Sequence, residues 1–169
     1  MRPKLHVIAW LAAAAAGAVS TAAAAAPAHH PAASCSALSR EVGREGASTL
    51  VARLRSNGGW DGVLDRIGQG SPECVRLAGA LKPGADAATS EGLRMALSDA
   101  LQTNPAAVLQ FGEAAWPLRE ICRDNHIEPT AAQARRFHAR AVAALSRVRA
   151  PALAGRRDAC LSGLQRRGA

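Results

Sequence analysis

One histidine has acidic neighbours at a spacing that could support acid–base chemistry. His126 lies two residues from Asp124 and two from Glu128, in a segment expected to join two helices. An imidazole beside a carboxylate is a common pair in general acid–base catalysis. No second catalytic group accompanies it, and the chain has no nucleophile elbow, zinc-protease motif, glycine-rich phosphate loop or calcium loop. We therefore interpret His126 as a loop histidine, assign no catalytic or cofactor-binding residue, and predict that the protein is not an enzyme.

The N-terminus has the layout of a secretory signal peptide. Arg2 and Lys4 precede an apolar stretch, residues 7–19, that is too short to cross the ~30 Å hydrocarbon core as a helix. No later apolar run is long enough for a membrane helix, so we expect an exported protein, periplasmic or secreted. The expected organisation is a signal peptide at 1–28, cleaved after about residue 25 or 28, a linker at 29–36, and a single helical domain at 37–169.

Cleavage after Ala28 would place His29 at the new N-terminus, followed by His30. A terminal amine and an imidazole can chelate Cu(II), which favours nitrogen ligands in a tetragonal arrangement. The alternative, which we favour, is a loose leader with two incidental histidines. Copper binding is therefore kept as a second functional hypothesis.

The chain has four cysteines, Cys35, Cys74, Cys122 and Cys160. An even number in an exported chain predicts two disulfides, for which three connectivities exist. We prefer Cys35–Cys74 with Cys122–Cys160, because this pairing closes two loops of similar length between neighbours in sequence. No two cysteines are close enough to form a zinc knuckle, so we expect no metal at these positions.

Apolar residues recur at three- and four-residue spacing along most of the mature chain, a pattern typical of amphipathic helices. We find no convincing alternating strand pattern. Most of the expected helices are short and bounded by proline or glycine, which favours helix–turn–helix stacking over a long four-helix bundle. The predicted fold is all-α, with about eight short helices in a compact helix–turn–helix stack and two disulfides.

Capping side chains mark several helix starts. Ser71-Pro72 and Asn104-Pro105 combine a cap with a proline at the first helical position, and the segment from Thr130 fits a capping box. Residues 127–129 are expected to be extended, because a proline pushes its predecessor out of the helical region. The expected helices are 36–57, 60–67, 71–81, 90–101, one from 104, one from 116, 130–149 and 152–166.

The positive charge is concentrated near the C-terminus. Residues 119–169 carry 11 arginines and 4 acidic side chains, whereas residues 29–118 are nearly balanced. Such an excess can attract an acidic protein, a phosphate-bearing polymer or an anionic membrane surface, although a solvated arginine-rich face is the simpler alternative. Nucleic acid is not expected, because no aromatic residue is interleaved with these arginines to stack bases. The arginines of the candidate binding surface are Arg135, Arg136, Arg140, Arg147, Arg156 and Arg157.

Four segments resemble a group of small, uncharacterised, exported all-helical proteins of proteobacteria. They are WDGVLDRIGQG at 60–70, the stretch at 93–109 ending in ALQTNPAAVL, the pattern I-C-x-x-x-x-I-E-P-T at 121–130, and RDACL at 157–161. The resemblance implies an all-helical exported domain and carries no catalytic residues. The chain is also loosely similar to disulfide-stapled immunity proteins that neutralise type VI secretion effectors in the periplasm. This similarity is limited to size, expected cellular location and helical content.

Taken together, these patterns predict an exported, disulfide-stapled protein-binding module, immunity-like or inhibitor-like in kind. Its partner is expected to be another protein, with an acidic one favoured by the arginine-rich last third. The alternatives are copper binding through His29-His30 and an envelope protein attracted to anionic surfaces, with membrane association left open.

Overall fold

The computed structural model describes residues 33–165, apart from the side chain of Ala114. The expected signal peptide, residues 29–32 of the expected linker and the His29-His30 pair lie outside the described residues. The last two residues of the expected linker, 35 and 36, belong to α1. Within them, the elements are α1 (Cys35–Glu45), α2 (Ala47–Ser56), α3 (Trp60–Gly68), α4 (Pro72–Leu81), the 3-10 turn η1 (Lys82–Gly84), α5 (Ala87–Thr103), α6 (Pro105–Phe111), η2 (Gly112–Ala114), α7 (Leu118–Ile121), α8 (Ala131–Ser146), η3 (Pro151–Leu153) and α9 (Ala154–Gln165). The prediction of an all-α fold is confirmed.

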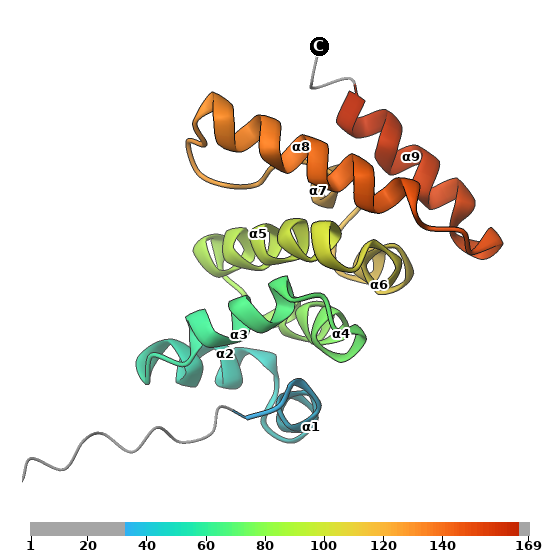
Figure 1. Ribbon diagram of the computed structural model, residues 1–169. Helices are drawn as coiled ribbons and strands as arrows, with labels where there is room; N and C mark the ends of the chain where they lie inside the picture. The colour runs from blue at the N-terminus through green and yellow to red at the C-terminus, as the bar shows by residue number, and fades with distance from the viewer. Residues whose placement is uncertain (1–32, 166–169) are drawn as a thin grey trace, which may run out of the picture. The chain divides into compact units, whose positions relative to one another are not determined.

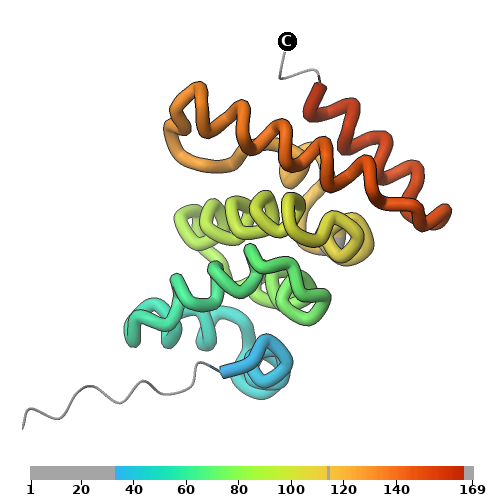
Figure 2. The backbone as a smooth tube through the Cα atoms, viewed as in Figure 1, coloured from blue at the N-terminus to red at the C-terminus, as the bar shows by residue number. Residues whose placement is uncertain are grey.

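Successive helices of residues 33–165 are stacked in layers (Figure 1). The layers are α1 with α2, α3 with α4, α5 with α6, and α8 with α9, and α7 lies next to the last layer. Each layer packs on the next: α1 contacts α4, α4 contacts α6, α3 contacts α5, and α5 contacts α8, as the backbone trace in Figure 2 also shows. Each helix pair thus buries its apolar face against its neighbours in sequence, as in helical repeat folds.

Both disulfides connect helices that the stack brings side by side. Cys35 at the start of α1 pairs with Cys74 on α4, and Cys122 after α7 pairs with Cys160 on α9. The preferred connectivity is therefore confirmed. Within residues 33–165, no helix is both long enough and apolar enough to cross a bilayer.

The helix starts marked by capping side chains form as expected. Ser71 accepts a hydrogen bond from the backbone of Cys74, with a proline at the first helical position of α4. Asn104 caps α6 in the same way. At α8, Thr130 and Gln133 form a reciprocal capping box. These side chains satisfy backbone N–H groups that have no partner in the first turn of a helix.

Three predicted helix boundaries are wrong, and one of them is the C-terminal end of the helix expected at 130–149, which lies at Ser146. The single helix expected at 36–57 is divided at Gly46, whose φ of 85° lies in the left-handed region, and α2 starts in a new direction after it. The fourth helix begins at Ala87 rather than near Ser90. Asp86 caps it, because its carboxylate accepts hydrogen bonds from both the backbone and the hydroxyl of Thr89.

Helix α5 lies in the middle of the stack and contacts α3, α4, α6, α7 and α8. Leu93, Leu97 and Leu101 are fully inaccessible to solvent along its buried face. Because helix positions three and four residues apart share a face, the same helix presents Met95, Asp99 and Gln102 on another side. That side is turned toward α8 and the segment before it, and it forms part of the site described below.

We predict that Gly84→Ala will destabilise the protein. A Cβ atom at this position would overlap backbone atoms of Ala47 and Ser48, where η1 packs against the first turn of α2. Because backbone cannot move aside as a flexible side chain can, the free energy of unfolding should fall by roughly 1 to 3 kcal/mol. Urea denaturation followed by circular dichroism measures the change.

Gly43→Ala is the matched control. Gly43 is exposed inside α1, and a Cβ atom there meets nothing within 4 Å. Alanine should raise the free energy of unfolding by roughly 0.5 to 1 kcal/mol, because glycine is a poor helix former. Equal effects of the two substitutions would contradict the close packing of η1 on α2.

A candidate binding groove between α5 and α8

A cavity of about 550 Å³ lies between α5, α8 and the segment 122–130 that connects α7 to α8. We call it the α5–α8 groove, and its volume is in the range of ligand sites, roughly 300 to 1,000 Å³. The residues that line it are Met95, Asp99 and Gln102 from α5, Asp124, His126, Ile127, Glu128 and Pro129 from the connecting segment, and Gln133, Arg136, Phe137 and Arg140 from α8.

The connecting segment is held in place at its first half. The Cys122–Cys160 disulfide ties it to α9. The side chain of Asn125, only 5% exposed, donates to the carbonyl of Glu120 at 2.9 Å and accepts from Nε of Arg123 at 2.8 Å. The hydroxyl of Ser98 on α5 donates to the carbonyl of Arg123. These contacts give the wall of the groove a defined position relative to α5.

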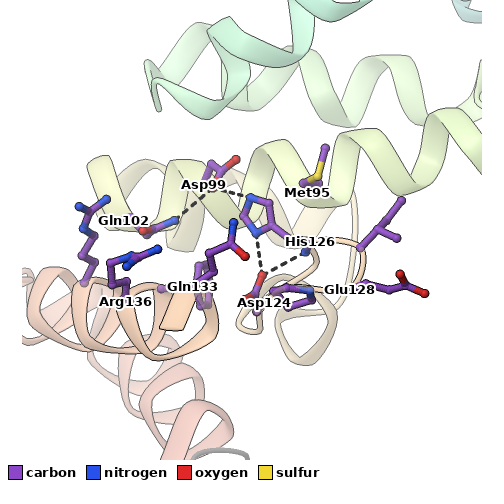
Figure 3. Close-up of a pocket in the computed structure, with 12 residues that line it drawn as sticks. Met95, Asp99, Gln102, Asp124, His126, Glu128, Gln133 and Arg136 are labelled. Atoms are coloured by element: carbon purple, nitrogen blue, oxygen red, sulfur yellow. Dashed lines mark hydrogen bonds and ion pairs between the residues drawn. The ribbon is translucent and has the colours of Figure 1, made fainter. Parts of the chain in front are cut away.

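His126 lies between two carboxylates in the groove (Figure 3). Its Nδ1 is 2.6 Å from Oδ1 of Asp124, and the same oxygen accepts the backbone N–H of His126 at 3.0 Å. Its Nε2 is 3.4 Å from Oδ1 of Asp99. The ring also lies edge-on to Phe137, with centroids 6.4 Å apart. Both ring nitrogens are therefore engaged with acidic side chains.

The acidic neighbours of His126 differ in part from those suggested by the sequence. Asp124 is a partner, but Glu128 points away from the histidine in Figure 3, and the second carboxylate is Asp99 from α5. Asp99 is distant in sequence, and only the packing of α5 against α8 and the connecting segment brings it near. No local motif could have indicated it.

Burial raises the pKa of Asp99 above its ordinary value of 3.8. The attraction of His126 lowers this pKa and the repulsion of Asp124 raises it, so burial decides the direction of the shift. Asp124 is also under-satisfied: its Oδ2 is inaccessible and has no hydrogen-bond partner among the described residues. The negative charge of Asp99 is thus held at some cost in stability.

We predict that Asp99→Asn will be more stable than the wild type at neutral pH, and that this difference will disappear in acid. A carboxyl whose pKa is raised by folding binds its proton more tightly in the folded state, so stability falls as the pH rises through that pKa. Asparagine removes this dependence. The effect should be small, because the side chain of Asp99 is 41% exposed and solvent screens its charge.

Chemical denaturation across pH checks this prediction. The difference in the free energy of unfolding between Asp99→Asn and the wild type should be largest at neutral pH and shrink as the pH falls toward 3.8. A difference that grows in acid would mean that the ionised carboxylate stabilises the fold.

Of the six arginines in the candidate surface, only Arg136 and Arg140 line the α5–α8 groove. They lie one turn apart on α8, and neither makes an ion pair or hydrogen bond with any described residue. Arg135 lines a second cavity of about 360 Å³ on another side of α8.

The other three arginines lie beyond the groove. Arg147 caps the C-terminal end of α8. Arg156 connects α9 to the end of α6, through Glu113 at 3.0 Å and the carbonyl of Leu109 at 3.1 Å. Arg157 donates to the carbonyl of Val148 and to Asp158. The structure therefore does not bring the six arginines together on one surface.

Two unusual residues follow His126. Ile127 is 78% exposed and is the one large hydrophobic side chain classed as exposed among residues 33–165. Glu128 has a φ of 47°, in the left-handed region, so the extended conformation predicted at this position is wrong. A non-glycine residue in that region costs about 1 kcal/mol or more, and such strain gathers at functional sites.

Charged, amide and apolar side chains line the groove. It contains no serine, threonine or cysteine that could act as a nucleophile beside His126. In the part of the chain that the structure describes, no three His, Cys, Asp or Glu side chains are arranged to hold a metal ion. The groove instead combines unpaired guanidinium groups with an exposed apolar side chain.

Comparison with family models, characterised proteins and solved structures found no match to this chain. The resemblance to small exported proteins of proteobacteria stays a prediction.

Proposed function

We propose that the protein is an exported protein-binding module and that the α5–α8 groove receives its partner. The observation that carries this proposal is the pairing of two kinds of unsatisfied side chain at one site. Arg136 and Arg140 have no acidic partner among the described residues, and Ile127, which lines the same groove from the connecting segment, is largely exposed. Exposed arginine and large apolar side chains are what protein–protein contacts typically bury.

The disulfides support an exported location. Structural disulfides persist in oxidising compartments and are rare in the cytosol, and the chain has two of them, with no free cysteine among the described residues. The signal-peptide pattern at residues 1–28 also supports an exported location.

An inhibitor-like or immunity-like role fits a module of this kind. The Cys122–Cys160 disulfide and the buried Asn125 hold the connecting segment before any partner arrives. A preformed surface loses less conformational entropy on binding, which favours tight complexes. Neither copper binding nor attraction to an anionic surface gains such support: His29-His30 lies outside the described residues, and the arginines are dispersed.

Site-specific photo-crosslinking in the producing cells tests the proposal. A photoreactive amino acid in place of Ile127 should give a covalent adduct of defined mass with one protein. Arg40 is the control position, because it is exposed on α1 at the other end of the stack. Adducts absent at position 127, or identical at both positions, would show that the groove is not the partner surface.

A further inference from the structure

We infer that the α5–α8 groove recognises an acidic side chain and a large apolar side chain of one segment of the partner protein. This inference rests on the proposed function and adds the chemistry of the partner. Three features of the groove lead to it: its cationic wall, the engagement of Asp99 and Asp124 by His126, and its apolar rim.

The cationic wall is formed by Arg136 and Arg140. Some arginines elsewhere in the described residues pair with acids: Arg53 bridges Glu41 and Glu45, and others pair with Asp86, Glu91 and Glu113. The two groove arginines make no such pair with a described residue, although the same groove contains Asp99 and Asp124. Guanidinium groups bind carboxylates in a bidentate geometry, so they are suited to an acid from outside.

His126 engages two of the three acids of the groove, Asp99 and Asp124, whereas Glu128 points away from it. Asp124 accepts the backbone N–H of His126 and contacts its Nδ1, while Asp99 faces its Nε2. In Figure 3 the ring lies between the two carboxylates, and Arg136 reaches up from α8 beside this cluster. His126 is therefore a positioning residue, which holds these two acids and keeps the cationic wall available.

The apolar rim is formed by Ile127 on the connecting segment. Ile127 stands 78% exposed on the connecting segment, while Phe137 is buried against the ring of His126. Met95 lines the opposite side from α5. A large apolar side chain of the same bound segment would cover Ile127, removing apolar area from water.

The exposure of these groups favours a polypeptide over a small anion. Arg136, Arg140 and Ile127 are all exposed, so the cationic wall and the apolar rim are both open to solvent. A small anion would leave Ile127 in water, whereas a peptide segment can satisfy the arginines and cover the isoleucine together.

Selection from a random peptide library tests the inference. The peptides should be displayed internally, flanked by protein on both sides, so that no free C-terminal carboxylate is offered. The purified, oxidised protein is the target. We expect enrichment of sequences that contain both Asp or Glu and a large apolar residue. Replacing the acid by Asn or Gln should weaken binding by about tenfold or more.

Two charge-matched double variants identify the surface. Arg136→Gln/Arg140→Gln should weaken binding of the selected peptide by at least about tenfold. Arg135→Gln/Arg147→Gln removes the same number of charges outside the groove, and it should leave the affinity within about threefold. His126→Ala should also weaken binding, because Asp99 and Asp124 could then pair with the arginines and compete with the acid of the peptide.

Three outcomes would overturn the inference: no enrichment, enrichment of sequences without an acid, or equal binding by Arg136→Gln/Arg140→Gln and the wild type. If any of these occurs while position 127 still gives a specific adduct in cells, the partner chemistry is wrong and the proposed function stands. If the adduct is absent as well, both fail.

Discussion

Replacing Cys122 and Cys160 with serine is expected to lower the free energy of unfolding by about 4 kcal/mol. The disulfide joins residues 38 apart in sequence, and its loss frees a loop of that length in the unfolded chain. It also releases the connecting segment from α9, because Cys122 immediately follows α7. Chemical denaturation under non-reducing conditions measures the global effect.

The Cys35–Cys74 pair provides the control for local effects. It closes a loop of almost equal length, with a separation of 39, so its removal should have a similar effect on global stability, about 4 kcal/mol. It connects α1 to α4, away from the groove. Only the Cys122→Ser/Cys160→Ser variant should weaken peptide binding under conditions where both variants remain folded. Equal binding by both variants would mean that the disulfide does not position the groove.

Ile121→Ala is expected to lower the free energy of unfolding by about 2 to 5 kcal/mol. Ile121 is fully inaccessible in α7, a helix of 4 residues that packs against α5, α9 and η2. Such a short helix has little stability of its own, and its start has no side-chain cap. Its position therefore depends on burial of this side chain, and the segment that carries His126 begins directly after it.

Leu118→Ala in the same helix is the comparison. Leu118 is only partly buried, so its truncation should destabilise the protein less than that of Ile121. Ile121→Val, which removes one methylene, should cost about 0.5 to 1.5 kcal/mol. A larger effect at Leu118 than at Ile121 would contradict the packing of α7.

Local features of the fold were predictable from the sequence because they depend on neighbouring residues. The caps at Ser71, Asn104 and Thr130 each act on a backbone group a few residues away. The disulfide pairing followed from a preference for contacts between sequence neighbours, which a layered stack satisfies. The break at Gly46 was missed because glycine can either remain in a helix or adopt positive φ.

The groove was less predictable because it depends on tertiary packing. Asp99 reaches His126 only because α5 packs beside the connecting segment. Charge composition indicated arginines near the C-terminus, but it could not separate Arg136 and Arg140, in the groove, from Arg156, which is bound to Glu113. The conformation of Glu128 opposes the ordinary preference before proline, so no local rule would have given it.

Once the partner has been identified by cross-linking, hydrogen exchange tests whether it binds in the α5–α8 groove. The free protein and the complex, assembled from purified components, should differ in amide protection at residues 122–140. In the complex we expect slower amide exchange in the connecting segment and the first half of α8, and unchanged exchange in α1 and α2. Protection confined to α1 and α2, or absent from residues 122–140, would contradict the assignment of the α5–α8 groove as the binding surface.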